Sequence, residues 1–155
     1  STGKYLPSAW DNRHLLTLSG TYKLPKNWDI GLKLRVMGGA PFTPYDENLS
    51  SIVSAWDATA RPYYDYGLYN TERLKTFSQI DFRLDKSFYF KGVMLGIYID
   101  LQNIGNFKYD SQPVLVSTGV VDPQIYPDGN QHYKMKYIRQ QSGTILPTLG
   151  LTVEF

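Results

Sequence analysis

The stretch Gln79-Ile-Asp-Phe-Arg-Leu-Asp-Lys-Ser-Phe-Tyr-Phe90, continued through Lys91-Gly92 into Val93-Met-Leu-Gly-Ile-Tyr-Ile-Asp-Leu101, decides the fold. Before the Lys-Gly dipeptide, apolar side chains occupy nearly every even position and polar side chains most odd positions. After it, the odd positions are apolar. A period of two residues is typical of a β-strand with two different faces. The two-residue connection predicts a tight antiparallel hairpin.

Three further segments show the same period of two, at 14–24, 28–36 and 145–155. No segment shows a helical period, so the sequence predicts an all-β antiparallel fold. Allowing for extensions at the strand ends, the five strands are expected at about 12–24, 28–40, 77–90, 93–107 and 143–155.

The connections between these strands alternate between short and long. The residues 25–27 and 91–92 form two short turns, whereas 41–76 and 108–142 are long loops. Loops of this length inside a compact soluble domain count against a strand assignment. Outer-membrane barrels alternate short periplasmic turns with long extracellular loops. The pattern therefore favours a barrel whose loops at 41–76 and 108–142 face the outside of the cell.

Composition excludes several classes of protein. The chain has 155 residues, no cysteine and a net charge of +2, and its basic residues are scattered. The lack of cysteine excludes a disulfide framework and thiolate metal sites, and the scattered basic residues argue against nucleic acid as a partner. The chain lacks an apolar run long enough for a transmembrane helix. It opens without methionine, and we expect it to be part of a longer polypeptide.

Two kinds of sheet compete for this pattern: a soluble antiparallel sandwich, and a transmembrane barrel with its apolar face in lipid. Each segment approaches the roughly 9–11 residues that a tilted strand needs to cross a bilayer. Aromatic residues gather at the segment ends, and the last strand finishes on Phe155. These features favour the barrel. Because an odd number of antiparallel strands cannot close, the five strands are expected to be part of a larger barrel.

Six motifs in order along the chain resemble TonB-dependent outer-membrane receptors, particularly those of Bacteroidetes-type bacteria. They are Trp10-Asp-Asn-Arg-His14, Leu18-Ser-Gly-Thr-Tyr22, Gly38-Gly-Ala-Pro-Phe-Thr-Pro-Tyr45, Ile80-Asp-Phe-Arg-Leu-Asp-Lys86, Asp100-Leu-Gln-Asn-Ile104 and the ending Gly143-Thr-Ile-Leu-Pro-Thr-Leu-Gly-Leu-Thr-Val-Glu-Phe155. The resemblance implies a Gram-negative outer-membrane barrel of about 22 strands around a plug, of which this chain supplies the last five. The plug domain is not in this chain.

The same resemblance implies uptake of a scarce solute (a siderophore, glycan, peptide or vitamin) with energy supplied by the inner membrane. The implied partners are outer-membrane lipid, the rest of the barrel with its plug, TonB through that plug, and the barrel assembly machinery, with a surface lipoprotein as a further candidate. Two alternatives stay open. One is a non-transporting, receptor-like barrel that serves as a structural subunit, and the other is a soluble glycan-binding β-sandwich.

Three groups of residues are candidates for function. By resemblance, the last strand is the signal read by the assembly machinery, through Leu151, Val153 and Phe155. Charges at mid-strand are expected to face the lumen, form cross-strand ion pairs and hold the plug: Lys33, Arg35, Asp81, Arg83, Asp85 and Asp100. Aromatic residues of the loop 41–76 offer flat faces for glycans or aromatic siderophores, and five of them are expected ligand contacts: Trp56, Tyr63, Tyr64, Tyr66 and Tyr69.

No cofactor, metal site or catalytic residue is predicted. The only histidines, His14 and His132, have no partner at metal-ligand spacing, and Pro127-Asp-Gly-Asn130 is typical of a turn rather than of a calcium loop. A hydrolase would need one of these histidines beside a serine of the lumen or of a loop. Because nothing in the sequence singles out such a serine, the chain is not expected to be an enzyme.

Overall fold

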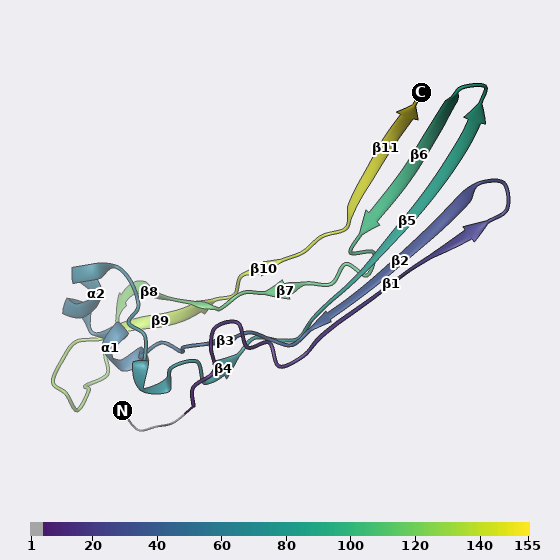
Figure 1. Cartoon of the computed structure of the whole chain (residues 1–155). Helices are drawn as coiled ribbons and strands as arrows, with labels where there is room; N and C mark the ends of the chain where they lie inside the picture. The colour runs from purple at the N-terminus through teal and green to yellow at the C-terminus, as the bar shows by residue number, and fades with distance from the viewer. Residues whose placement is uncertain (1–4) are drawn as a thin grey trace. The chain divides into compact units, whose positions relative to one another are not determined.

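The computed structural model describes residues 5–155 and confirms an all-β, antiparallel architecture (Figure 1). Five strands form one sheet in the order β1-β2-β5-β6-β11, in which every neighbouring pair is antiparallel. These strands are β1 (Leu15–Leu24), β2 (Trp28–Met37), β5 (Phe77–Phe90), β6 (Val93–Gln102) and β11 (Leu146–Glu154). The chain divides into two compact units: this sheet with its turns, and a second unit made of 1–11, 40–74 and 110–141.

The register of the sheet separates apolar from polar side chains. Leu18 lies opposite Leu34, Leu34 opposite Ile80, and Leu149 opposite Ile99, so apolar residues share one face. Their chain neighbours, among them Ser19, Lys33, Asp81 and Thr148, share the other face. The period of two in the sequence therefore corresponds to two chemically different faces.

Both predicted hairpin turns are present. Lys26 and Asn27 adopt φ of 63° and 61° between β1 and β2, and Gly92 adopts φ of 82° between β5 and β6. Positive φ values of this kind suit the right-handed twist of the flanking strands. At the other end of the sheet, four strands stop short of their predicted bounds. At the end of β6, for example, Asn103 turns the chain with φ of 55°, and its side-chain Nδ2 donates to the carbonyls of Phe107 and Thr144.

The loop unit contains more regular structure than the sequence indicates. The loop 41–76 holds β3 (Pro41–Phe42), α1 (Glu47–Ser51), α2 (Val53–Thr59), the 3-10 helix η1 (Tyr66–Leu68) and β4 (Glu72–Arg73). The loop 108–142 holds β8 (Val114–Val121) and β9 (Tyr133–Ile138), which form an antiparallel pair. A ribbon of β7 (Tyr109–Asp110) and β10 (Gln141–Ser142) completes the list. Helices of five and seven residues are too short to show a helical period.

Gly38, directly after β2, is a position where only glycine fits. It is buried, and its N–H donates to the carbonyl of His14 at 2.9 Å. A Cβ at this position would collide with the backbone carbonyl of Asn12. We expect Gly38→Ala to lower the free energy of unfolding by about 1–3 kcal/mol, measured by urea titration with tryptophan fluorescence. Gly20→Ala is the matched control, because a Cβ there meets nothing within 4 Å, and an equal loss in both variants would contradict the prediction.

Candidate functional site in the loop unit

The first helix of the loop unit is set by a local cap. Asp46 is its N-cap, and the Asp46 Oδ1 accepts a hydrogen bond from the Leu49 N–H at 2.9 Å. Such a cap satisfies one of the free amide groups at the start of a helix. The helix places Ser50 and Ser51 inside the loop unit, where both are buried. The Ser50 hydroxyl accepts from the Tyr63 N–H at 2.8 Å, which ties the helix to the returning chain.

Three tyrosines form an aromatic row on the loop unit. The rings of Tyr45 and Tyr64 stack with centroids 4.8 Å apart, and Tyr66 follows with its centroid 6.2 Å from that of Tyr64. Burial and the neighbouring Tyr64 hydroxyl raise the pKa of Tyr45 to about 12. The exposed fractions of Tyr64 and Tyr66 are 43% and 74%, so flat ring surface is available to a ligand.

Two hollows flank this row. The first has a volume of about 370 Å³ and includes Tyr45. The second, of about 290 Å³, includes Tyr64 and Tyr66. Phe42 and Gln112 line both hollows, so the two are neighbours. Their volumes are near the lower end of the range for small-molecule sites.

The predicted ligand residues separate into two groups. Tyr64 and Tyr66 line the second hollow, as a ligand contact requires. Trp56 is half-buried within α2, and the Tyr63 hydroxyl donates to the carbonyl of Ala55, so Tyr63 packs the loop onto itself. Tyr69 is 42% exposed and follows η1. Trp56, Tyr63 and Tyr69 line neither of these two hollows.

Sequence reasoning missed several residues that line the first hollow. Glu72 comes from the ribbon of β3 and β4, whereas Gln112, Tyr137 and Arg139 come from the ribbon of β8 and β9 and the residues next to it. The Tyr137 hydroxyl donates to Glu47 at 2.7 Å, and burial together with this contact raises the pKa of Tyr137 to about 12. No local signal marks these residues, since 40 or more positions of sequence separate Glu72 from each of the others.

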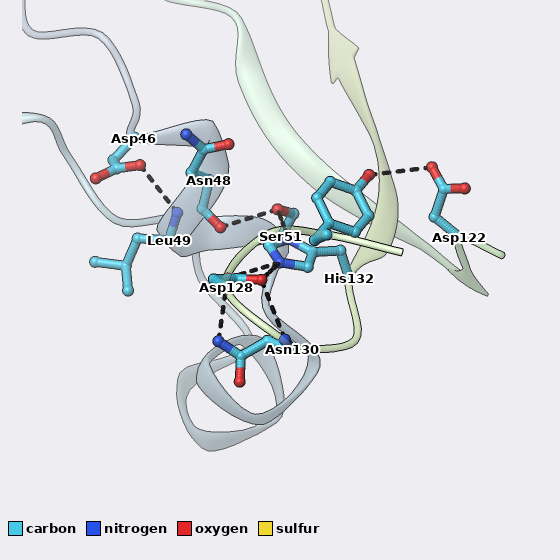
Figure 2. Close-up of polar contacts among 9 residues, drawn as sticks. Asp46, Asn48, Leu49, Ser51, Asp122, Asp128, Asn130 and His132 are labelled. Atoms are coloured by element: carbon cyan, nitrogen blue, oxygen red, sulfur yellow. Dashed lines mark hydrogen bonds and ion pairs between the residues drawn. The ribbon is translucent and has the colours of Figure 1, made fainter. Parts of the chain in front are cut away.

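A second polar cluster joins the two long loops (Figure 2). The Nδ1 of His132 lies 2.7 Å from the Oγ of Ser51, and its Nε2 lies 3.0 Å from an Asp128 carboxylate oxygen. The ring of Tyr126 stacks on the imidazole at a centroid distance of 3.9 Å. The exposed fractions of His132 and Ser51 are 2% and 9%. The condition that the sequence set for a hydrolase, a loop serine beside a histidine, is therefore met at Ser51.

The details of this cluster favour a structural joint over a catalytic site. The Ser51 hydroxyl also contacts the carbonyl of Asn48 at 2.9 Å, and its single proton cannot serve both Asn48 and the imidazole. Backbone hydrogen bonds continue the joint, from Val53 N–H to Gln131 and from Asp122 N–H to His132. None of the hollows in the loop unit described above includes Ser51 or His132. The polar atoms of the Ser51 and His132 side chains are therefore engaged in hydrogen bonds within the loop unit.

Asp128 belongs to the predicted turn at 127–130. Gly129 has φ of 73°, and the Asp128 Oδ1 accepts from the Asn130 N–H at 3.1 Å. Hydrogen bonds from Asn130, assisted by His132, hold the pKa of Asp128 below its ordinary value. The stabilisation from this carboxylate is thus present above the ordinary pKa of aspartate and is lost as the pH falls through the lowered value.

The six predicted lumen-facing charges share the polar face of the sheet. Register places Lys33 opposite Asp81, Arg35 opposite Gln79, and Arg83 opposite Asp100. Within residues 5–155, these six residues do not form the expected cross-strand ion pairs, and Arg83 instead pairs along its own strand with Asp85 at 2.8 Å. Residues two positions apart in a strand lie on the same face, and the long arginine side chain can reach from one to the next. Part of this face lines a hollow of about 440 Å³: Ser19, Thr21, Lys33, Asp81, Arg83, Asp100 and Gln102.

Arg83 and Tyr98 also fasten the last strand. The Arg83 guanidinium lies 4.1 Å above the Tyr98 ring, and Tyr98 covers its cross-strand neighbour Gly150. The residues that the assembly machinery is predicted to read lie after Gly150, at the end of β11 and directly after it. Leu151 and Val153 are 72% and 48% exposed on the apolar face, and Phe155 is fully exposed.

Comparison with known proteins leaves the family open. No protein family, curated protein or solved structure matches the chain. Among residues 5–155, no helix is long and apolar enough to cross a membrane. The same residues contain no group of three or more histidine and acidic side chains placed to hold a metal ion. The resemblance to TonB-dependent receptors is therefore carried by the sequence motifs alone.

Proposed function

We infer that this chain is the C-terminal part of the barrel of a TonB-dependent outer-membrane transporter that takes up a scarce solute. The observation that carries the proposal is the apolar face of the five-stranded sheet. Large aliphatic side chains on it remain exposed in both edge strands, at Leu18 (56%) and Leu149 (75%), and also in β2, at Leu32 (53%). An uncovered apolar face of this kind would drive aggregation in water, whereas in a bilayer it would contact the lipid chains.

The distribution of buried residues supports the same environment. Among the alanine, valine, isoleucine, leucine, methionine, phenylalanine, tryptophan and tyrosine residues at 5–155, Leu115 in β8 is the one that is buried, at 1% exposure. The sheet therefore has no hydrophobic core of its own within the described chain. A soluble sandwich requires a second sheet packed against the apolar face. The exposure of that face thus disfavours the glycan-binding sandwich.

The opposite face suits a water-filled lumen or a plug. It carries charges of both signs, and part of it lines the 440 Å³ hollow. Porin-like barrels alternate lipid-facing apolar residues with lumen-facing polar residues along each strand. The strands have 9 to 14 residues, which is enough for tilted strands to cross a bilayer.

The free edges of the sheet indicate what the rest of the barrel must supply. Because five antiparallel strands alternate in direction, β1 and β11 run the same way at opposite edges. They cannot pair with each other as antiparallel neighbours. An odd number of additional strands must lie between them to close an antiparallel barrel of even strand number. In this arrangement both short turns lie on the periplasmic side, and the loop unit lies outside the cell.

The transport mechanism follows from this placement together with the family resemblance. The loop unit would capture the solute outside the cell, and the polar face of the sheet would line its route around the plug. Energy would reach the plug from the inner membrane through TonB. The residues of this chain supply capture and passage, and the plug supplies gating.

The decisive experiment compares the protein with and without detergent. We expect the longest natural form of the protein to fractionate with outer membranes, to require detergent for solubility, and to show β-type circular dichroism in micelles. Radiolabelled solute uptake that depends on TonB would then separate a transporter from a structural subunit. A monomer that is soluble without detergent would contradict the membrane assignment.

The C-terminal residue offers a second test of the membrane assignment. We expect Phe155→Ala to reduce outer-membrane insertion of the full-length protein several-fold, because the terminal aromatic is the implied contact for the assembly machinery. Insertion is measured as the heat-modifiable folded band in membrane fractions. Tyr5→Ala is a control at another fully exposed aromatic residue. Normal insertion of the Phe155 variant would remove the assembly role.

A further inference from the structure

The first hollow of the loop unit is lined by one formal charge of each sign, and the two charged residues come from different ribbons. Glu72 lies in β4, where it pairs with Phe42 of β3. Arg139 directly follows β9, on the ribbon of β8 and β9. Neither side chain makes an ion pair or a side-chain hydrogen bond within residues 5–155. Both charged groups are therefore available to a ligand.

The other side chains at the hollow contribute no further formal charge. Tyr45 and Tyr137 are neutral at physiological pH, as tyrosines ordinarily are, and burial raises their pKa values further, to about 12. The nearby carboxylate of Glu47 is engaged by the Tyr137 hydroxyl at 2.7 Å. A ligand in the hollow thus meets one cationic and one anionic side chain.

The rest of the lining is mostly apolar and partly aromatic. Phe42, Pro44 and Pro113 line it together with the two tyrosine rings. Gln112 donates its Nε2–H to the carbonyl of Thr43 at 2.9 Å, and its own amide oxygen has no partner within the described chain. That oxygen can accept a hydrogen bond from an N–H donor of the ligand.

We propose that this hollow binds a short free peptide, with its terminal carboxylate on Arg139, its terminal ammonium on Glu72 and an apolar side chain between them. The guanidinium fork matches a carboxylate in two parallel hydrogen bonds. A neutral oligosaccharide would leave both charges without a counter-charge. A volume of about 370 Å³ suits a peptide of a few residues. The proposal rests on the proposed function, in which these loops capture a solute outside the cell.

The test measures binding of the tripeptide Ala-Phe-Ala to the full-length protein in detergent micelles by isothermal titration calorimetry. N-acetylation removes the ammonium of the peptide, and C-amidation removes its carboxylate. We expect each modification to weaken binding to the wild-type protein about tenfold or more. In Glu72→Gln, N-acetylation should cause no further loss, and in Arg139→Gln, C-amidation should cause no further loss.

Lys136→Gln is the matched control, because Lys136 is an exposed cation of β9 three residues from Arg139 and does not line the hollow. This variant should bind all three peptides as the wild type does. Because the test compares peptides within one variant, a general loss of folding cannot imitate the expected pattern. The proposal is overturned if the tripeptide does not bind, if the modifications have no effect, or if their effects persist in the variants. The membrane assignment is judged separately, by detergent dependence.

Discussion

Replacing Leu149 by arginine should strongly reduce insertion of the protein into the outer membrane. Leu149 lies in the middle of β11, opposite Ile99, and is 75% exposed on the apolar face. An arginine on the lipid face near the bilayer midplane costs about 2–4 kcal/mol. For a protein in water, the same change at so exposed a leucine would be nearly neutral. The two environments therefore predict different outcomes for one substitution.

Thr148→Arg provides the control at the neighbouring position. Thr148 lies on the polar face, opposite Asp100, so its arginine meets a carboxylate across the strands. We expect this variant to insert as well as the wild type. Stability is measured by urea unfolding in lipid vesicles, and insertion by the heat-modifiable band. Equal behaviour of the two variants would show that lipid does not contact the apolar face.

The five main strands could be predicted because apolar and polar residues alternate within each of them, so the sequence of a strand alone indicates which residues share a face. The alternation from Ile80 to Phe90 needs no information from elsewhere in the chain, and the same holds for the turn at Lys91-Gly92. The ends of the strands depend on distant partners. β2 stops where Gly38 packs against Asn12, and the chain after β6 is turned by Asn103 contacts to Phe107 and Thr144. The pattern within a strand does not contain those contacts.

The candidate site could be predicted only in part, for a related reason. The aromatic content of the loop pointed to ligand contact, and Tyr64 and Tyr66 do line a hollow. The charges of the neighbouring hollow, Glu72 and Arg139, come from two ribbons that are far apart in sequence. Ser51 and His132 are likewise separated by 81 positions. Local spacing cannot indicate such pairs, because only the packing of one loop on the other brings them together.

The joint between the loops should fail when His132 is replaced by alanine. The substitution leaves a cavity beside Tyr126 and deprives Asp128 and Ser51 of their shared partner. Losing a buried side chain and its hydrogen bonds costs about 2–4 kcal/mol of local stability. Two backbone amides report on the joint, because Val53 N–H donates to Gln131 and Asp122 N–H donates to His132.

Hydrogen exchange at the amides of Val53 and Asp122 should accelerate about 30-fold or more in His132→Ala, since each 1.4 kcal/mol of opening free energy is about a tenfold change in rate. His14→Ala makes the same substitution at an exposed histidine outside the joint and should leave both amides protected. Ser51→Ala removes one contact and should give an intermediate effect. Unchanged protection in His132→Ala would show that other contacts hold the loops together.

The same Ser51 variant separates the structural joint from a hydrolase. A serine nucleophile needs a free path to its substrate and a histidine that can take its proton. Ser51 is 9% exposed, and its hydroxyl is shared between Asn48 and His132. We therefore expect wild-type protein and Ser51→Ala to hydrolyse a p-nitrophenyl ester at the same background rate. A Ser51-dependent rate, with Val53 and Asp122 still protected in the variant, would instead assign the cluster to catalysis, because a purely structural serine cannot change turnover while the joint stays closed.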